Sequence, residues 1–217
     1  TPLLGVLEPK IKIKKSINIP NWVNNSVRVL KRPGFAYIAI VIDDMGVNRK
    51  RSDEGMNLEA PLTLSFLSYA PNLIEQTKIA SSMGHELLVH LPMEPQGDEN
   101  PGPGALLVKM TLSELNRRLE QALEKFPNFV GVNNHMGSLI TRHPGHMAWL
   151  MSEIAAYQHL FFVDSYTTAQ SIAGDMAADY GIPVTRRNIF LDNQPGEDQL
   201  MYEYRRLLSL ARKQGSA

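Results

Sequence analysis

Two adjacent carboxylates, Asp43 and Asp44, directly follow the apolar run 37–42. Two negative charges at the end of a buried strand repel each other unless a cation or positive groups lie between them. Because side chains alternate along a strand, one aspartate can bind a metal while its neighbour accepts a proton. The alternative is that an aspartate caps the next helix, which accounts for one member of the pair but hardly for both.

Two histidines stand at the ends of later apolar runs. His90 closes the run 86–90, and His135 lies in the segment Asn-Asn-His-Met-Gly-Ser that follows the run 129–133. A single histidine at a strand end is more often a hydrogen-bonded structural residue than a ligand. Two histidines and two aspartates that reach one sheet edge from three strands are much less probable by chance than any one of them alone. Together they match a divalent-metal site of imidazole and carboxylate with an open coordination position.

Three further carboxylates and two arginines lie near predicted strand ends. Glu94 follows the third strand and is a candidate ligand or site carboxylate, although the prolines around it disfavour a regular helix. Asp164 and Asp192 each end an apolar run, where they can orient a metal-bound histidine, tune the catalytic group or cap a helix. Arg186 and Arg187 can hold the first aspartate or a substrate oxyanion, or can lie exposed on the surface.

Strands alternating with helices are needed to bring these residues together. The pattern predicts a parallel α/β sheet, either open or closed into a barrel, with ligands at the carboxyl ends of the strands. The predicted strands are 36–43, 62–67, 86–91, 129–133, 160–164 and 182–185, with 189–191 as a candidate seventh. The predicted helices are 71–83, 111–126, 144–157, 169–180 and 198–213, and Thr-Leu-Ser-Glu at 111–114 is a capping box.

The composition excludes several classes of protein. The 217 residues carry no net charge, which argues against a general nucleic-acid binder. The absence of cysteine removes thiolate catalysis, cysteine-ligated zinc, iron–sulfur clusters and disulfides. No run of 18 apolar residues is present, so the sequence predicts no transmembrane segment.

Charge divides the chain into two parts. Residues 1–34 hold seven basic side chains and one acidic side chain, with an alternating Lys-Ile pattern at 10–14 that is typical of an edge strand or an extended arm. We interpret 1–34 as a basic N-terminal arm or tether, with contact to an anionic surface as the alternative. Residues 35–217 form the predicted folded domain.

Five motifs together resemble a known family. They are Ile40-Val-Ile-Asp43-Asp44-Met-Gly46, Gly84-His-Glu-Leu-Leu-Val-His90-Leu-Pro-Met-Glu94-Pro95, Gly131-Val-Asn-Asn-His135-Met-Gly-Ser138, Phe162-Val-Asp164-Ser165 and Arg187-Asn-Ile-Phe-Leu-Asp192. In this order they resemble the divergent polysaccharide deacetylases, relatives of the NodB-type carbohydrate esterases, from about residue 37 to the C-terminus. The resemblance implies a distorted (β/α) barrel of the glycoside hydrolase/deacetylase type with about seven parallel strands.

The resemblance also implies roles for individual residues. Asp43 would be the catalytic base, and Asp44 and His90 would bind the metal. The usual second motif is His-Ser/Thr-x-x-x-His or a near variant, and its second histidine falls near Glu94 in this chain, so His135 is our candidate for the third ligand. The usual late Leu-x-His motif is also absent, because residues 186–192 contain no histidine. Either His135 serves as the acid and Glu94 completes the metal set, or another route donates the proton.

The implied reaction is the hydrolysis of an N-acetyl or O-acetyl group on an envelope polysaccharide or amino-sugar oligomer, such as one derived from peptidoglycan. The implied cofactor is a divalent metal, with Zn²⁺ first and Co²⁺, Ni²⁺ or Mn²⁺ also accepted by such a ligand set. The resemblance, the missing thiols and a start without methionine together favour a periplasmic or secreted location.

Two other functions remain open at this point. The altered second motif and the missing late histidine favour a catalytically inactive barrel that binds a glycan or a protein in the cell envelope. A third interpretation is a glycosidase that uses two of Asp43, Asp164 and Asp192, which would require a carboxylate separation suited to that chemistry.

Overall fold

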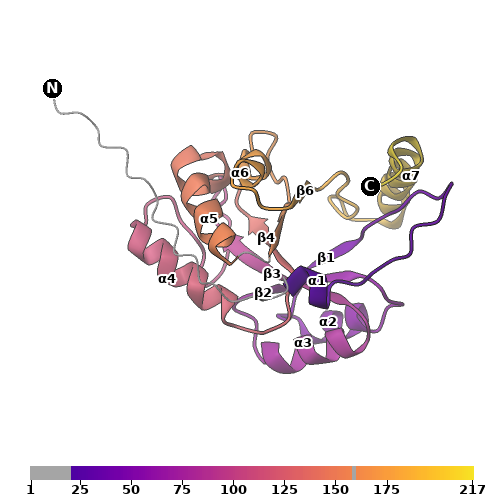
Figure 1. Ribbon diagram of the computed structural model, residues 1–217, viewed down its shortest axis with the longest axis horizontal. Coiled ribbons are helices and arrows are strands. Elements are labelled where there is room, and N and C mark those ends of the chain that lie inside the picture. The colour runs from indigo at the N-terminus through magenta and orange to yellow at the C-terminus, as the bar shows by residue number, and fades with distance from the viewer. Residues whose placement is uncertain (1–20, 158–159) are drawn as a thin grey trace.

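Six parallel strands form one curved sheet, in which neighbours along the chain are neighbours in the sheet (Figure 1). The computed structural model describes residues 21–157 and 160–217. The strands are β1 (Val41–Met45), β2 (Thr63–Leu67), β3 (Glu86–Met93), β4 (Gly131–Met136), β5 (Phe161–Asp164) and β6 (Val184–Arg186). Because β6 does not pair with β1 in this part of the chain, the sheet is an incomplete barrel. The predicted parallel α/β architecture is confirmed.

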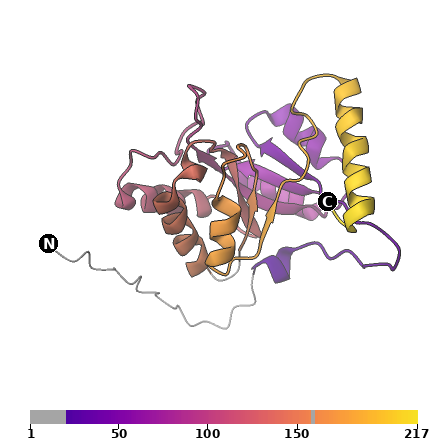
Figure 2. The same cartoon turned by 90° about the horizontal axis from the view of Figure 1, so that it is seen from above.

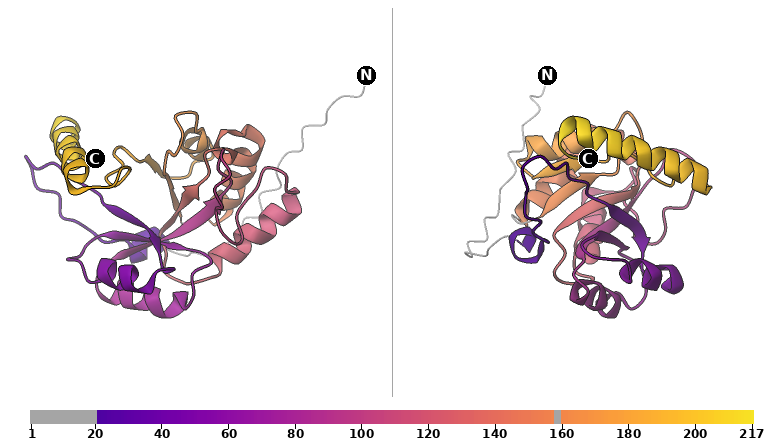
Figure 3. Two further views of the ribbon diagram at one scale, coloured as in Figure 1. Left: turned by 180° about the vertical axis from the view of Figure 1, so that it is seen from behind. Right: turned by 90° about the vertical axis from the view of Figure 1, so that its right-hand side faces the viewer.

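Helices surround the outer face of this sheet, and α7 stands apart from the others, with its C-terminal end beside the segment that leads into β1 (Figures 1 and 3). Thr111 accepts a hydrogen bond from the Glu114 backbone N–H at 3.3 Å, so the predicted cap of α4 is confirmed. The helices are α1 (Asn21–Asn25), α2 (Arg49–Met56), α3 (Leu73–Ser82), α4 (Leu112–Leu123), α5 (Pro144–Ala156), α6 (Ala173–Asp179) and α7 (Glu197–Gln214), with a 3₁₀ turn at Ile140–Arg142.

Two elements differ from the predicted ones at the ends of the domain. The predicted seventh strand at 189–191 is wrong, because that segment is irregular and leaves Phe190 44% exposed. The first strand starts later than predicted, because the backbone before it pairs with the C-terminal segment. Tyr37 N–H donates to the Gly215 carbonyl at 3.0 Å, and Ala39 N–H donates to the Ala217 carbonyl at 2.9 Å. Figure 2 shows the C-terminus beside this segment.

Helix α2 follows β1 directly but was not predicted. Its sequence Arg-Lys-Arg-Ser-Asp-Glu-Gly-Met has almost no apolar periodicity, which is the main sequence signal for a helix. Asn48 caps the helix and accepts a hydrogen bond from the Arg51 N–H at 3.1 Å. A cap and a buried Met56 are therefore enough to form a short helix where the pattern is polar.

The two faces of the sheet bury different residues. On β3, Leu87 and Val89 join the large core between the sheet and the helices, whereas Leu88 joins a smaller cluster with Val130 and Val163. This alternation with a period of two places Leu88 and then His90 on the inner face. The inner face is therefore apolar near the amino ends of the strands and polar near their carboxyl ends.

Gly131 lets β4 and β5 pack closely on this inner face. A Cβ atom at Gly131 would lie 2.5 Å from the Phe161 carbonyl oxygen and 2.8 Å from the Phe161 ring. We expect Gly131→Ala to lower the free energy of unfolding by about 1–3 kcal/mol, the usual cost of overpacking a core. Gly145→Ala is the control, because outside its own stretch of α5 no atom lies within 4 Å of the added Cβ. Equal urea midpoints for the two variants would contradict this account.

Glu86, at the start of β3, contacts the segment before β1. Its carboxylate accepts hydrogen bonds from the Val27 N–H at 3.2 Å and from the Thr63 hydroxyl at 3.2 Å. Burial raises the pKa of Glu86 above its ordinary value of 4.5, and the two hydrogen bonds oppose this shift in part. The folded state therefore binds this proton more tightly than the unfolded state does.

A pH-dependent stability difference follows from this shift. The free energy of unfolding contributed by Glu86 falls as pH rises from the ordinary pKa through the raised one. We expect Glu86→Gln to be more stable than the parent at neutral pH, with a difference that shrinks as pH falls toward 4.5. Thermal unfolding across this pH range measures it, with the exposed Glu59→Gln as control. A constant difference at all pH values would contradict the assignment.

The basic head is only partly within the described residues. Helix α1 and the segment that leads to β1 belong to it, whereas the predicted arm at 10–14 lies outside the described residues. None of the helices in the described ranges has the length and hydropathy that crossing a membrane requires.

Candidate metal centre

A bulge in β1 presents the two aspartates to the inner face. Ile42 pairs with Leu64 and Met45 pairs with Phe66, so two residues of β1 lie opposite one residue of β2. Asp44 has a φ of 58°, in the left-handed region that aspartate tolerates better than most residues. An extra residue breaks the alternation of side chains, so adjacent carboxylates can serve the same site.

Asp44, His90 and His135 converge on one point from β1, β3 and β4. The Asp44 Oδ1 atom lies 2.8 Å from His135 Nδ1 and 3.3 Å from His90 Nε2, and the two nitrogens are 3.2 Å apart. One ligand atom from each residue lies within 4.8 Å of the others. The imidazole rings meet edge to face with their centroids 4.9 Å apart. The predicted triad is thus a candidate metal site.

The electrostatics of this triad favour a positive charge. Hydrogen bonds to His135 and His90 hold the pKa of Asp44 well below its usual range, although burial opposes this. Burial also disfavours a charged His90, but Asp43 and Asp44 outweigh it and hold the pKa of His90 above its ordinary value. Two imidazole nitrogens and a carboxylate oxygen with access to solvent are a donor set that suits a divalent cation such as Zn²⁺. The residues therefore fit a metal.

Asn133 joins Asp43 to this triad, and the sequence analysis did not single it out as a site residue. Its amide nitrogen donates to Asp43 Oδ1 at 2.8 Å and to the Ser165 hydroxyl at 3.3 Å. Its amide oxygen accepts from His90 Nδ1 at 2.9 Å and from the Ser65 hydroxyl. The available signal was its position two residues before the candidate ligand on β4, which places both on one face of the strand.

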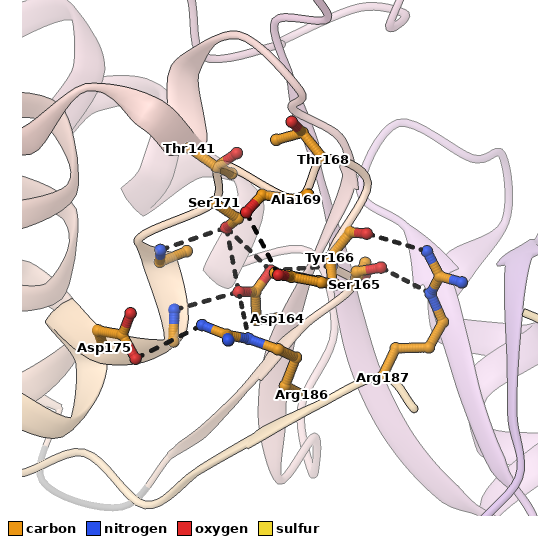
Figure 4. Close-up of polar contacts among 12 residues, drawn as sticks. Thr141, Asp164, Ser165, Tyr166, Thr168, Ala169, Ser171, Asp175, Arg186 and Arg187 are labelled. Carbon is orange, nitrogen blue, oxygen red and sulfur yellow. Dashed lines mark hydrogen bonds and ion pairs between the residues drawn. The ribbon is translucent and has the colours of Figure 1, made fainter. Parts of the chain in front are cut away.

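Arg187 lies half-buried, close enough to Asp43 for their charges to interact. Its guanidinium donates to the carbonyls of Ser165 at 2.6 Å and Tyr166 at 3.2 Å, as Figure 4 shows, and stacks 4.1 Å above the Phe190 ring. Burial lowers the pKa of Arg187, while nearby aspartates, Asp43 first among them, oppose the shift. Of the two alternatives for this arginine, the structure favours a held cation near the site over an exposed surface residue.

Asp164 follows Val163, which packs on the inner face, and its carboxylate turns to the first turn of α6 (Figure 4). Its fully buried carboxylate accepts hydrogen bonds from the Tyr166 N–H, the Ser171 hydroxyl and the Gly174 N–H. It also pairs with Arg186, whose Nε lies 3.3 Å from Oδ2. These four partners engage both oxygens, so the contacts favour the helix-cap alternative over a part in catalysis.

Asp164→Asn tests this structural role. We expect a loss of about 1.5–3 kcal/mol in the free energy of unfolding, because hydrogen bonds to a charged acceptor are weakened. Metal binding should stay unchanged. The matched control is Asp175→Asn, which removes the exposed partner of the same Arg186 and should cost less than about 1 kcal/mol. A normally stable Asp164→Asn protein that has lost turnover would restore the catalytic interpretation.

Glu94 and Asp192 are not brought to the triad. Glu94 accepts a hydrogen bond from the Val108 N–H at 2.6 Å, and its backbone N–H donates to the Leu106 carbonyl at 2.9 Å. It therefore fastens the loop between β3 and α4. Asp192 is exposed in the connection from β6 to α7.

Comparisons with known proteins identify the family of this chain. The family model of the divergent polysaccharide deacetylases matches residues 40–217. An uncharacterized protein of Haemophilus influenzae is 33% identical over 209 residues, which are 95% of this chain and 74% of that protein. The uncharacterized protein YibQ of Escherichia coli is 32% identical over 179 residues, 82% of this chain and 56% of YibQ. This chain therefore matches little more than half of the length of YibQ.

A solved structure has the same fold. The crystal structure of an uncharacterized protein of Agrobacterium tumefaciens C58 superposes with a TM-score of 0.86 at 26% identity, covering 92% of this chain and 81% of that one. The likeness supports the barrel-like architecture, and the family match supports the resemblance drawn from the motifs. The chain belongs to the divergent polysaccharide deacetylase family.

Proposed function

We propose that this protein is a metal-dependent hydrolase that removes acetyl groups from an envelope polysaccharide or amino-sugar oligomer. The observation that carries the proposal is the convergence of Asp44, His90 and His135 beside a second carboxylate, Asp43. The family match supports a carbohydrate substrate. Zn²⁺ is the cation that we propose first, with Co²⁺, Ni²⁺ or Mn²⁺ as replacements that the same donors accept.

The residues divide into ligands and a base. Asp44, His90 and His135 would hold the cation, which when bound polarises a carbonyl and lowers the pKa of water. Asp43 lies 3.9 Å from His90 Nδ1, and its carboxylate is 40% exposed, so water reaches it. An oriented carboxylate that solvent can reach is suited to take a proton from the attacking water. Asn133 keeps this carboxylate in place through its hydrogen bond, and the charge of Arg187 acts on it without direct contact.

If the proposal is right, the protein both binds a metal ion and releases acetate. Protein prepared with excess Zn²⁺ should retain about one ion per chain after dialysis, measured by elemental analysis. It should release acetate from N-acetylglucosamine oligomers or from peptidoglycan fragments, and a chelator should abolish the release. Protein without stoichiometric metal that leaves every acetylated glycan unchanged would refute the proposal.

A second candidate is a barrel that binds metal and glycan without turnover. One observation favours it: residues 186–192, where the family's late histidine is expected, contain none. This candidate predicts glycan binding by calorimetry and no acetate release under any metal. Acetate release that disappears in Asp43→Asn would exclude it.

We also propose that the protein acts in the periplasm or outside the cell. The family match and the absence of cysteine support this location. Fractionation of cells that express the complete natural protein tests it, and recovery in the cytosolic fraction alone would contradict it.

A further inference from the structure

We propose that Asn133 is a positioning residue that keeps a proton on His90 Nδ1 and thereby directs the Nε2 lone pair at the metal site. This inference rests on the proposed function for its catalytic meaning, but its geometry stands independently. Asn133 is 1% exposed in the middle of β4, and its amide contacts both Asp43 and His90.

Asp43 fixes the orientation of the Asn133 amide. An ionised carboxylate only accepts hydrogen bonds, so the group that lies 2.8 Å from Asp43 Oδ1 must be the NH₂ of Asn133. The second hydrogen of that NH₂ is directed to the Ser165 hydroxyl at 3.3 Å. The amide oxygen therefore faces His90 and Ser65. Asp43 thus decides which way the amide points.

The orientation of this amide in turn fixes the tautomer of His90. An amide oxygen has no hydrogen to give, so His90 Nδ1, at 2.9 Å, must be the donor. This holds for both the neutral and the charged imidazole, because Nδ1 carries a hydrogen in each. The proton that His90 can release is therefore the one on Nε2, which faces Asp44 at 3.3 Å and His135 at 3.2 Å.

The tautomer of His90 determines which of its nitrogens can bind a metal. An imidazole binds a cation through a nitrogen that carries no hydrogen, and a partner on the other nitrogen fixes which one that is. Asn133 supplies that partner and also holds Asp43. The buried amide of Asn133 therefore links a proposed metal ligand, His90, to the proposed base, Asp43.

Nuclear magnetic resonance of protein labelled with ¹⁵N-histidine tests the tautomer directly. The signal of His90 is assigned from its absence in His90→Gln. We expect Nδ1–H at His90 in the parent protein at alkaline pH, both without metal and with Zn²⁺. In Asn133→Ala we expect a mixture of tautomers. The Zn²⁺ affinity of that variant should fall by about 10–100-fold, the usual effect of losing such a partner.

Two variants separate positioning from simple structural support. Asn134→Ala removes a neighbouring amide that is equally buried but bonds the Ser165 N–H and the Met136 carbonyl instead. It should lower the melting temperature and leave the His90 tautomer unchanged. Asn133→Asp keeps an oxygen toward His90, so it should keep Nδ1–H, but it places an oxygen against Asp43 and should slow acetate release.

The outcomes are distinguishable from those of the proposed function. A parent protein with the hydrogen of His90 on Nε2 in the metal-free state would overturn the inference, whether or not any variant folds. So would an Asn133→Ala protein with the parent's tautomer and Zn²⁺ affinity. Nδ1–H at His90 in a protein that binds no Zn²⁺ would refute the proposed function and leave the positioning role of Asn133 supported.

Discussion

Asp43→Asn is expected to reduce the rate of acetate release by about 10²–10⁴-fold, the usual contribution of a general base. Metal content should not change, because the ligands of the candidate site are Asp44 and the two histidines. The substitution keeps the shape of the side chain, and the new amide oxygen can still accept the hydrogen bond from Asn133. A steady-state assay with elemental analysis of the same sample measures both quantities.

The control for this variant is Asp192→Asn, which removes an exposed carboxylate from the connection after β6. It should keep the parent rate within about twofold, since surface substitutions away from the site have small effects. If Asp43→Asn turns over at the parent rate, Asp43 is not the base. If Asp192→Asn loses turnover instead, the assignment of the catalytic carboxylate moves to the loop before α7.

His90→Ala is expected to abolish stoichiometric Zn²⁺ binding. Removing a residue that only hydrogen-bonds to a ligand lowers metal affinity by up to about 100-fold, and removing the ligand itself should lower it further. The parent protein should melt at a higher temperature when Zn²⁺ is added, because a ligand that binds only the folded state stabilises it. The variant should show no such rise.

His85→Ala is the matched control, because His85 is also a buried histidine. It lies before β3 rather than at its carboxyl end, and it bonds the Met56 carbonyl at 2.9 Å and the Leu62 N–H at 3.3 Å. This variant should lose stability and still show the full Zn²⁺-dependent rise in melting temperature. Normal zinc binding by His90→Ala would remove His90 from the site.

The convergence of the three ligands was predictable from the sequence because parallel strands end at one edge. Asp44, His90 and His135 each stand at or just after an apolar run, and this was enough to place them together. The bulge in β1 was not predictable, since a two-against-one register depends on how β2 pairs with β1.

The apolar pattern of the sequence did not reveal which way the side chains of Asp164 and Asn133 point, and their roles depend on this direction. Val163 packs on the inner face of the sheet, so the next residue, Asp164, points to the outer face and reaches α6. Asn133 shares the inner face with His135, and this position two residues before the candidate ligand was its only sequence signal. The strand predicted at 189–191 failed for a different reason. A three-residue apolar run does not reveal whether a neighbouring strand has a free edge with which it could pair.

The most direct test of the central claim is an anomalous-difference map from crystals of the complete protein grown with Zn²⁺, collected on both sides of the zinc absorption edge. We expect one strong peak bonded to an Asp44 carboxylate oxygen, His90 Nε2 and His135 Nδ1, with Asp43 beside it but outside bonding distance. A map without a peak at these residues under saturating Zn²⁺, or with zinc held by a different set of side chains, would contradict it.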